Sequence, residues 1–312
     1  MEKSSKILIY GAMGIVILIL ALTGIIVAVM NIPIEGSSGE IAVIDLDGTI
    51  YSGGTEEDLF SDYQPGVEDY IEWIEDAQED DGTKAILIRI NSPGGEAIAS
   101  EKLARAIKEA SEKKVVVAYV ESMAASAAYQ AASSTDYIVA EKQSLVGNIG
   151  VRMEIIHYYG LMDDLGINVT TIKSGEYKDI GSPTRPMTEE EKEMLGSIVN
   201  ESYDDFVSWV AENRNMSLEE AYKVADGRIY SGSQAKKAGL VDMVGTEEDA
   251  IDITAEMAGI TGEPDLYEYE GKSSGFLGMK LNDALYSFGY GFGKGLAATS
   301  VEEASSSYGM YF

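Results

Sequence analysis

Ser126 is the first residue whose type and surroundings suggest chemistry. It stands in SMAASAAYQAAS, which follows the apolar run VVVAYVE and consists almost entirely of small residues. The apolar run is typical of a buried strand, and the small residues favour a closely packed helix after it. A serine at the start of that helix would have backbone N–H donors beside its oxygen, which suits a nucleophile that forms an oxyanion. From position alone, a serine that only packs is the alternative.

The composition restricts the base that could activate such a serine. The chain contains one histidine, His157, and no cysteine. His157 lies among apolar and aromatic residues at helical spacing, so we expect it to be structural rather than part of a catalytic triad. Thiol nucleophiles, disulfides and zinc sites with two histidines are excluded by the same counts.

Lysine is the remaining candidate for a base. The turn-rich segment IKSGEYKDIGSPTRPMT, residues 172–188, contains Lys173 and Lys178, and we expect this loop to lie over a cleft. A lysine acts as a general base only when its pKa falls from about 10.4 to near 7 or 8. A solvated loop lysine is the alternative interpretation.

Repeated strand and helix patterns predict the elements that must position these residues. Nearly continuous apolar runs separated by amphipathic stretches indicate βαβ units, hence an α/β fold with a parallel sheet. Ligands bind such sheets at the carboxyl ends of the strands, where NSPGG (91–95) predicts a turn with outward-facing amides. We expect strands at 41–50, 84–90, 115–120, 137–140 and 166–172, the first ending in a turn at Asp47 and Gly48, and helices over 67–77 and 97–114.

Capping signals mark the helices of the second half. Thr188 with Glu191, and Ser217 with Glu220, have the spacing of a capping box. They predict a long amphipathic helix over 187–215 and a second helix from 218. Residues 231–245 predict a short helix that stops at Gly239, followed by a strand.

The N-terminal segment predicts a membrane anchor. Residues 7–30 contain no charged side chain, and a helix of that length can cross a hydrocarbon core of about 30 Å. A cleavable signal peptide is the alternative, although its apolar core usually spans only about 7 to 15 residues. Because Lys3 and Lys6 precede the segment while Glu35 and Glu40 follow it, we expect a cytoplasmic N-terminus and a catalytic domain on the outer face.

The charge balance excludes one class of partner. The chain has 53 acidic and 23 basic side chains, for a formal net charge of −30. Such a surface repels nucleic acid and other polyanions. We interpret the acidity as a source of solubility rather than as a device that steers substrates.

Five motifs in order resemble one known family. NSPGG, SMAAS, GNIGV, KSGEYKDIGSPTRPMT and GRIYSGSQAKKAGLVD, spread over about residues 40–260, resemble signal peptide peptidase A (SppA), the membrane-anchored serine-lysine peptidases of ClpP/crotonase-like fold. The resemblance implies that Ser126 is the nucleophile and Lys178 the general base. It also implies an oxyanion hole at Gly95 and Ala127. Asn148 takes the place of a serine that orients the lysine in relatives.

The resemblance also implies an activity and an organisation. It implies hydrolysis of signal peptides or other small hydrophobic peptides through an acyl-enzyme, no metal or organic cofactor, and assembly into a homo-oligomer. The alternatives are a crotonase-type acyl-CoA enzyme and a non-catalytic membrane scaffold. The expected organisation is a cytoplasmic N-terminus at 1–6, the anchor at 7–30, a linker at 31–39, the peptidase domain at 40–262 and a Gly/Tyr/Phe-rich tail at 263–312.

Overall fold

The computed structural model describes residues 39–54 and 64–269. The predicted anchor at 7–30 lies outside these residues, as does most of the predicted tail. Within the described part of the chain, no helix combines the length and the apolar character needed to span a membrane.

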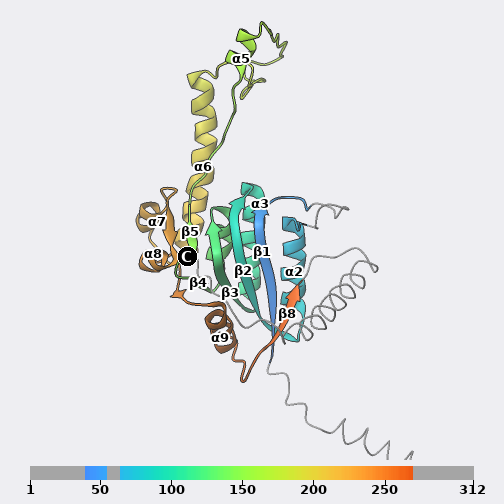
Figure 1. Cartoon of the computed structure of the whole chain (residues 1–312), viewed down its shortest axis with the longest axis vertical. Helices are drawn as coiled ribbons and strands as arrows, with labels where there is room; N and C mark the ends of the chain where they lie inside the picture. The colour runs from blue at the N-terminus through green and yellow to red at the C-terminus, as the bar shows by residue number, and fades with distance from the viewer. Residues whose placement is uncertain (1–38, 55–63, 270–312) are drawn as a thin grey trace, which may run out of the picture.

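A parallel-rich sheet forms the centre of the fold (Figure 1). Six strands follow the order β6-β5-β3-β2-β1-β8, and β4 and β7 join the sheet beside β3. Every pair is parallel except β5 with β6. The predicted α/β class with a parallel sheet is confirmed, and the architecture fits a ClpP-like fold. The strands are β1 Glu40–Ile50, β2 Thr83–Gly95, β3 Val115–Ala125, β4 Tyr137–Ala140, β5 Leu145–Gly147, β6 Ile229–Ser231, β7 Met243–Val244 and β8 Asp265–Tyr269.

Helices cover both faces of this sheet. Alternate residues of the central strands point to opposite faces, because side chains in a strand have a period of two. One face packs against α2 (Val67–Glu79), α3 (Ala97–Ser111), α4 (Ala127–Ser133) and the end of α6 (Glu189–Asn213). The other face packs against α9 (Glu247–Met257). The predicted helices and both predicted capping boxes are present, the second at α7 (Leu218–Val224), and the short predicted helix is α8 (Gly232–Lys237).

An arm projects from the body of the molecule. It consists of the coil that leaves β5, the short helix α5 (Tyr159–Asp164), the loop after α5 and the first half of α6, and we define it as residues 151–200. Figure 1 shows α6 running out of the body, with α5 beyond its far end. Among the described residues, twenty large hydrophobic side chains are exposed, and eleven of them lie on the arm. The arm therefore has an apolar surface that the body leaves uncovered.

The predicted strand at 166–172 is wrong. These residues form irregular chain on the arm, and Ile172 is 97% exposed. A β-branched pattern forms a strand only where another strand supplies hydrogen bonds, and none of the described strands lies beside this segment. His157, predicted at helical spacing, also lies in exposed coil of the arm.

Two predicted turns are strand irregularities instead. Asp47 and Gly48 form a bulge in β1, which continues to Ile50. The segment NSPGG continues β2, so that Gly94 and Gly95 pair with Thr49 and Ile50 of β1. The sheet also extends beyond residue 262, because β8 pairs with β1.

Candidate active site

Ser126 occupies a strained backbone position between a strand and a helix. β3 ends at Ala125 and α4 begins at Ala127, and Ser126 between them has φ 54° and ψ −122°. Positive φ is uncommon outside glycine and costs about 1–3 kcal/mol, and such strain gathers at functional sites. Within the described residues, the Ser126 hydroxyl has no hydrogen-bond partner. It is free to face a ligand.

Backbone hydrogen bonds hold Ser126 in this conformation. Its N–H donates to the carbonyl of Gly147 at 2.8 Å, and its own carbonyl accepts from the N–H groups of Tyr129 and Gln130 at 2.9 and 3.0 Å. Tyr129 is fully buried, and its hydroxyl donates to the carbonyl of Leu240 at 2.8 Å. Hydrogen bonds to β5 and α4 therefore hold the backbone of Ser126 in its strained conformation.

Two glycines at the end of β2 allow close backbone approaches, one to β1 and one to the serine. A β-carbon on Gly95 would lie 1.9 Å from the carbonyl oxygen of Ile50. One on Gly94, whose φ is 97°, would lie 2.8 Å from the Ala127 nitrogen and 2.9 Å from the Ser126 β-carbon. Only glycine permits this approach. Gly94 is therefore the glycine that lies against Ser126 and Ala127, while Gly95 lies against β1 and lines the same cleft as Ser126.

Asn148 belongs to the same neighbourhood. Its φ is 51°, and its backbone N–H donates to the carbonyl of Arg228 at 2.8 Å. Its side-chain nitrogen donates to the carbonyl of Gly227 at 2.7 Å. The side-chain oxygen, an acceptor, has no partner within the part of the chain that the structure describes, and it could accept a hydrogen bond from an ammonium group.

One cleft contains four of the five predicted site residues. Its volume is about 1130 Å³, and the end of β2, the first turns of α3 and α4, the chain after β5 and the second half of α6 form its walls. That volume suits an extended peptide segment, and its walls include both apolar and acidic side chains. The predicted residues in the lining are Ser126, Gly95, Ala127 and Asn148; the apolar side chains include Ile98, Phe206 and Trp209, and the acidic ones are Glu96, Glu101, Asp205 and Glu212.

The wall formed by α6 was missed by sequence reasoning. Phe206 and Trp209 line the cleft, but both also pack against the body, where Phe206 is buried and Trp209 donates to the hydroxyl of Ser134 at 3.0 Å. An amphipathic pattern shows which face of a helix is buried. It does not show which residues of that face pack in the core and which line a cleft. No sequence signal distinguishes these two residues from ordinary core.

Lys178 does not lie in this cleft. Its turn is attached to the first turn of α6, where the Tyr177 hydroxyl donates to Glu190 at 2.6 Å, whereas the cleft begins on the same helix at Ser202. At about 1.5 Å per residue, twelve residues of helix separate these points by about 18 Å. A lysine side chain cannot cross that distance, so the Lys178 and Ser126 of one chain do not meet.

The two lysines of the loop differ in their contacts. Lys173 donates to the carbonyl of Glu176 and to the carboxylate of Asp179, both at 2.5 Å. Lys178 is exposed, and in the described ranges its ammonium has no hydrogen-bond or ion-pair partner. Lys173 is therefore committed within its own chain, while Lys178 is available to another group.

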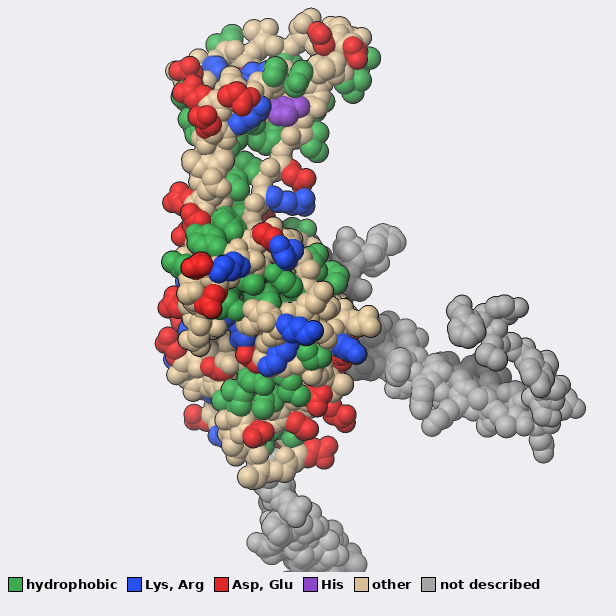
Figure 2. All heavy atoms as spheres, turned by 90° about the vertical axis from the view of Figure 1, so that its left-hand side faces the viewer, with side chains coloured by type: hydrophobic (Ala, Val, Ile, Leu, Met, Phe, Trp, Pro, Cys, Tyr) green, Lys and Arg blue, Asp and Glu red, His purple; other side chains and the backbone are tan. Residues whose placement is uncertain are grey.

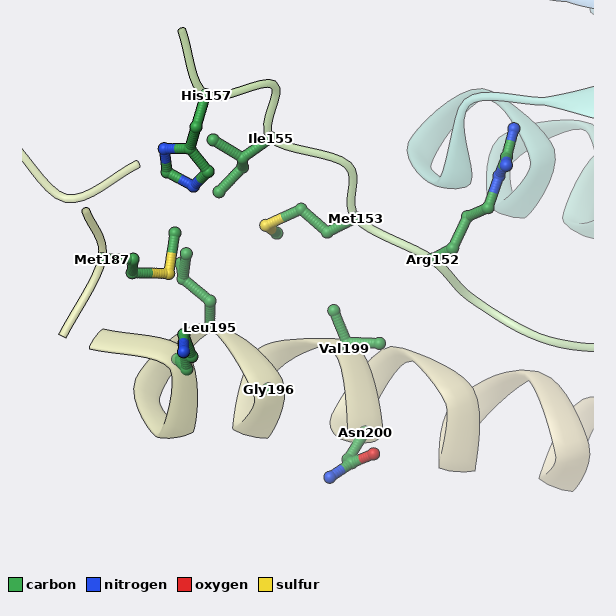
Figure 3. Close-up of a pocket in the computed structure, with 10 residues that line it drawn as sticks. Arg152, Met153, Ile155, His157, Met187, Leu195, Gly196, Val199 and Asn200 are labelled. Carbon is green, nitrogen blue, oxygen red and sulfur yellow. The ribbon is translucent and has the colours of Figure 1, made fainter. Parts of the chain in front are cut away.

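A second, smaller groove lies on the arm. Its volume is about 490 Å³, and it separates the coil after β5 from the first half of α6. Figure 3 shows Met153, Ile155 and His157 pointing from the coil toward the helix, where Leu195 and Val199 point back at them. The groove is lined mainly by apolar side chains, with Arg152 and Lys192 as its charged residues, and contains none of the predicted catalytic residues.

A family model and several relatives indicate one enzyme class. A family model described as peptidase family S49 matches residues 108–261. A relative from Methanocaldococcus jannaschii, named as a protease, is 49% identical over 90% of this chain and 87% of its own length. A relative from Enterococcus faecium, named as a signal peptide peptidase SppA, is 33% identical over 87% of this chain and 78% of its own. The chloroplastic serine protease SPPA of Arabidopsis thaliana is 37% identical over 62% of this chain and 29% of its own.

Proposed function

Because the chain belongs to peptidase family S49, the family of signal peptide peptidase SppA, and is a serine protease, we propose that it cleaves peptides with a Ser126–Lys178 dyad. The observation that carries the proposal is the strained Ser126, which lines a peptide-sized cleft together with Gly95 and Ala127. Its substrates are signal peptides or other small hydrophobic peptides, and the chain is anchored in a membrane by residues 7–30.

The proposed reaction follows serine acyl transfer. The Ser126 hydroxyl oxygen attacks a peptide carbonyl while Lys178, in its neutral form, takes the hydroxyl proton. Backbone N–H groups of Gly95 and Ala127 stabilise the oxyanion of the tetrahedral intermediate. The amine leaves with the proton that Lys178 returns, and water then hydrolyses the acyl-enzyme by the same sequence of steps.

The lysine of each site comes from a second copy of the chain. The turn that carries Lys178 contacts Glu190, which lies about 18 Å along α6 from Ser202 in the cleft of the same chain. Lys178 is exposed and belongs to the arm, which projects from the body (Figure 1). Another copy can receive this arm so that its own Ser126 meets the incoming Lys178. Asn148 of the receiving copy, whose side-chain oxygen has no partner among the described residues, then accepts a hydrogen bond from the ammonium.

The apolar surface of the arm supports such an assembly. Exposed patches of this kind mark interfaces, and an arm with so many exposed hydrophobic side chains is poorly suited to water. Figure 2 shows hydrophobic side chains gathered around the histidine of the arm. The groove of about 490 Å³ between the coil and α6 belongs to the same surface. The proposed occupant of this surface is a second copy of the chain, in a homo-oligomer.

The proposed location follows the charges around the N-terminal segment. Lys3 and Lys6 precede the uncharged residues 7–30, so the N-terminus lies in the cytoplasm and the catalytic domain on the outer face. On the outer face, the cleft can bind peptides that leave the membrane or lie on its surface. The apolar side chains Ile98, Phe206 and Trp209 in the cleft suit apolar peptide segments.

The two alternative functions have less support. A crotonase-type acyl-CoA enzyme would bind a polyphosphate, which the cleft disfavours because four acidic side chains line it against one basic side chain, Arg152. A non-catalytic scaffold has no need of a strained serine in an open cleft. The relatives from Methanocaldococcus jannaschii and Enterococcus faecium are named as a protease and a signal peptide peptidase, which favours peptide hydrolysis over both.

Two substitutions test the dyad. With a fluorogenic apolar peptide as substrate, Ser126→Ala and Lys178→Ala should each lower kcat at least about a thousandfold, because each removes a group that acts in the transition state. An acyl-serine probe should label the wild type at Ser126 and leave Ser126→Ala unlabelled. Lys173→Ala is the matched lysine variant, and it should keep far more activity. Full activity in Ser126→Ala or in Lys178→Ala would overturn the proposal.

A further inference from the structure

Arg185 links two carboxylates near the end of the arm. Its guanidinium donates to Asp179 from Nε at 2.9 Å and from Nη2 at 2.8 Å. It also donates to Glu191 from Nη1 at 2.8 Å and from Nη2 at 2.5 Å. Lys173 adds a fourth charged group, through Asp179. Both contacts of Arg185 are bidentate, the strongest geometry of an ion pair.

This cluster is less exposed than ordinary surface pairs. The side chain of Glu191 is only 4% exposed and that of Asp179 13%. The Arg185 guanidinium, with the Thr188 amide, lowers the pKa of Glu191 to about 2. Arg185 and Lys173 also lower the pKa of Asp179. The cluster therefore stays fully charged at neutral pH, and its members hold one another in place.

The cluster is attached to the turn that carries Lys178. Asp179 is the next residue after Lys178, and Tyr177 is the residue before it. Tyr177 donates to Glu190, while Asp179 reaches Glu191 through Arg185. Contacts of Tyr177 and of Asp179 therefore hold the turn on the first turn of α6. The Lys178 side chain, which lies between these two residues in the chain, has no partner in the described residues.

We propose that Arg185 is a positioning residue for the reaction: it fixes the turn 177–179 on α6 so that Lys178 enters the active site of a second copy in one orientation. The inference rests on the proposed function and deepens it. Arg185 itself need not touch the substrate. When a catalytic base is displaced by about 1 Å, the reaction rate can fall about a hundredfold. Contacts that fix the position of a lysine from another chain therefore have a large effect on the rate.

Three variants separate this role from general support of the fold. Arg185→Ala removes the link between Asp179 and Glu191. Asp179→Asn removes only the negative charge next to Lys178. Arg185→Lys keeps a positive charge without the planar guanidinium. We expect kcat to fall about tenfold to a hundredfold in Arg185→Ala, with KM within about threefold of the wild type. Asp179→Asn should change in the same direction, and Arg185→Lys should recover part of the rate. Lys223→Ala, which breaks the exposed Lys223–Glu219 pair on α7, is the control and should leave kcat unchanged.

The pH profile supplies the readout that a structural role would not move. In Arg185→Ala the loosened turn no longer holds the base in one orientation at the second active site, so the rising limb of kcat/KM moves to higher pH. Loss of folded protein alone would lower the rate equally at every pH. Circular dichroism and the size of the assembly should match those of the wild type.

The outcomes distinguish this inference from the proposed function. If Lys178→Ala is inactive while Arg185→Ala and Asp179→Asn keep the wild-type kcat and pH profile, the positioning role is wrong and the dyad stands. A rate that falls equally at all pH values in both variants also overturns the positioning role. If Lys178→Ala keeps its activity, the dyad itself is wrong, whatever Arg185 does.

Discussion

At the scale of single residues, the candidate site depends on backbone conformation as much as on side chains. Ser126 and Asn148 both have positive φ, at 54° and 51°, and hydrogen bonds of the sheet and its loops hold both. The Gly95 backbone approaches Ile50 too closely for any side chain. Strain of this kind persists only where surrounding structure compensates for it, which is why the site lies on the ends of buried strands.

The carboxylate of Glu191 provides a test at this scale. Arg185 and the Thr188 amide lower its pKa from about 4.5 to about 2. A carboxylate whose pKa is lowered by folding stabilises the fold fully above its unfolded pKa, and this contribution is lost as the pH falls through the folded value. Glu191→Gln keeps the capping box with Thr188 and removes only the charge. The wild type should therefore have the higher midpoint of thermal unfolding at pH 6, and the difference should shrink between about pH 4.5 and 2.

Calorimetry of both proteins across that range makes the comparison. Glu220→Gln, in the exposed capping box of α7, shows how much a charge in an exposed box contributes. A difference between wild type and Glu191→Gln that is the same at pH 6 and pH 2.5 would contradict the lowered pKa.

At the scale of elements, α6 has two functions along one helix. Its second half packs on the sheet and forms a wall of the cleft, while its first half leaves the body and carries the loop with Lys178. Arg214, immediately after α6, fastens the helix to the body through Asp242, at 2.9 and 2.6 Å. Asp242 also accepts from the Ile138 N–H of β4. The arm therefore extends from a fixed base.

Removing Arg214 should loosen that base. The Arg214 side chain is only 7% exposed, so Arg214→Ala leaves a partly buried carboxylate without its partner. We expect a loss of about 3–5 kcal/mol in the free energy of unfolding, measured with urea. Arg228→Ala breaks the exposed pair of Arg228 with Asp226 and should cost less than about 1 kcal/mol. Equal losses in the two variants would show that burial does not set the strength of these pairs.

The elements also show where prediction from the sequence succeeds. Continuous apolar runs correctly gave β1 to β4, since a parallel strand buried on both faces leaves that pattern in its own residues. The same apolar character wrongly predicts a strand at 166–172, where Ile167, Val169 and Ile172 are exposed on the arm. Apolar residues that serve an interface and apolar residues that serve a sheet look alike in one sequence.

The site was predicted unevenly for a related reason. Motifs placed Ser126, Gly95, Ala127 and Asn148, and all four line one cleft. The strain at Ser126 depends on how β3 ends, and the distance between Lys178 and the cleft depends on how far α6 extends. Neither property leaves a local signal in the sequence. His157 was expected at helical spacing and lies in exposed coil, because its apolar neighbours belong to the surface of the arm.

At the scale of the whole molecule, the proposed dyad requires more than one chain to complete an active site. One chain presents a cleft with a serine and, far from it, an arm with a lysine and a largely apolar surface. Both features are accounted for together if copies of the chain exchange arms. The net charge of −30 opposes association, so the apolar contacts of the arm must supply the attraction.

A charge on the arm tests whether its surface is an interface. Ile172 is 97% exposed, so Ile172→Glu should leave the fold of one chain intact while it weakens assembly and lowers peptidase activity together. Leu218→Glu, on an exposed site of α7 in the body, should change neither. Analytical ultracentrifugation in detergent gives the size of each assembly. A variant Ile172→Glu with wild-type size and activity would exclude this part of the arm from the interface.

Complementation between two inactive variants tests the central claim most directly. Ser126→Ala and Lys178→Ala chains are produced together and their peptidase activity is compared with that of each variant alone. If each site combines the serine of one copy with the lysine of another, random mixed assemblies should regain about a quarter of wild-type activity. Mixed assemblies that form and stay inactive would contradict a dyad shared between chains.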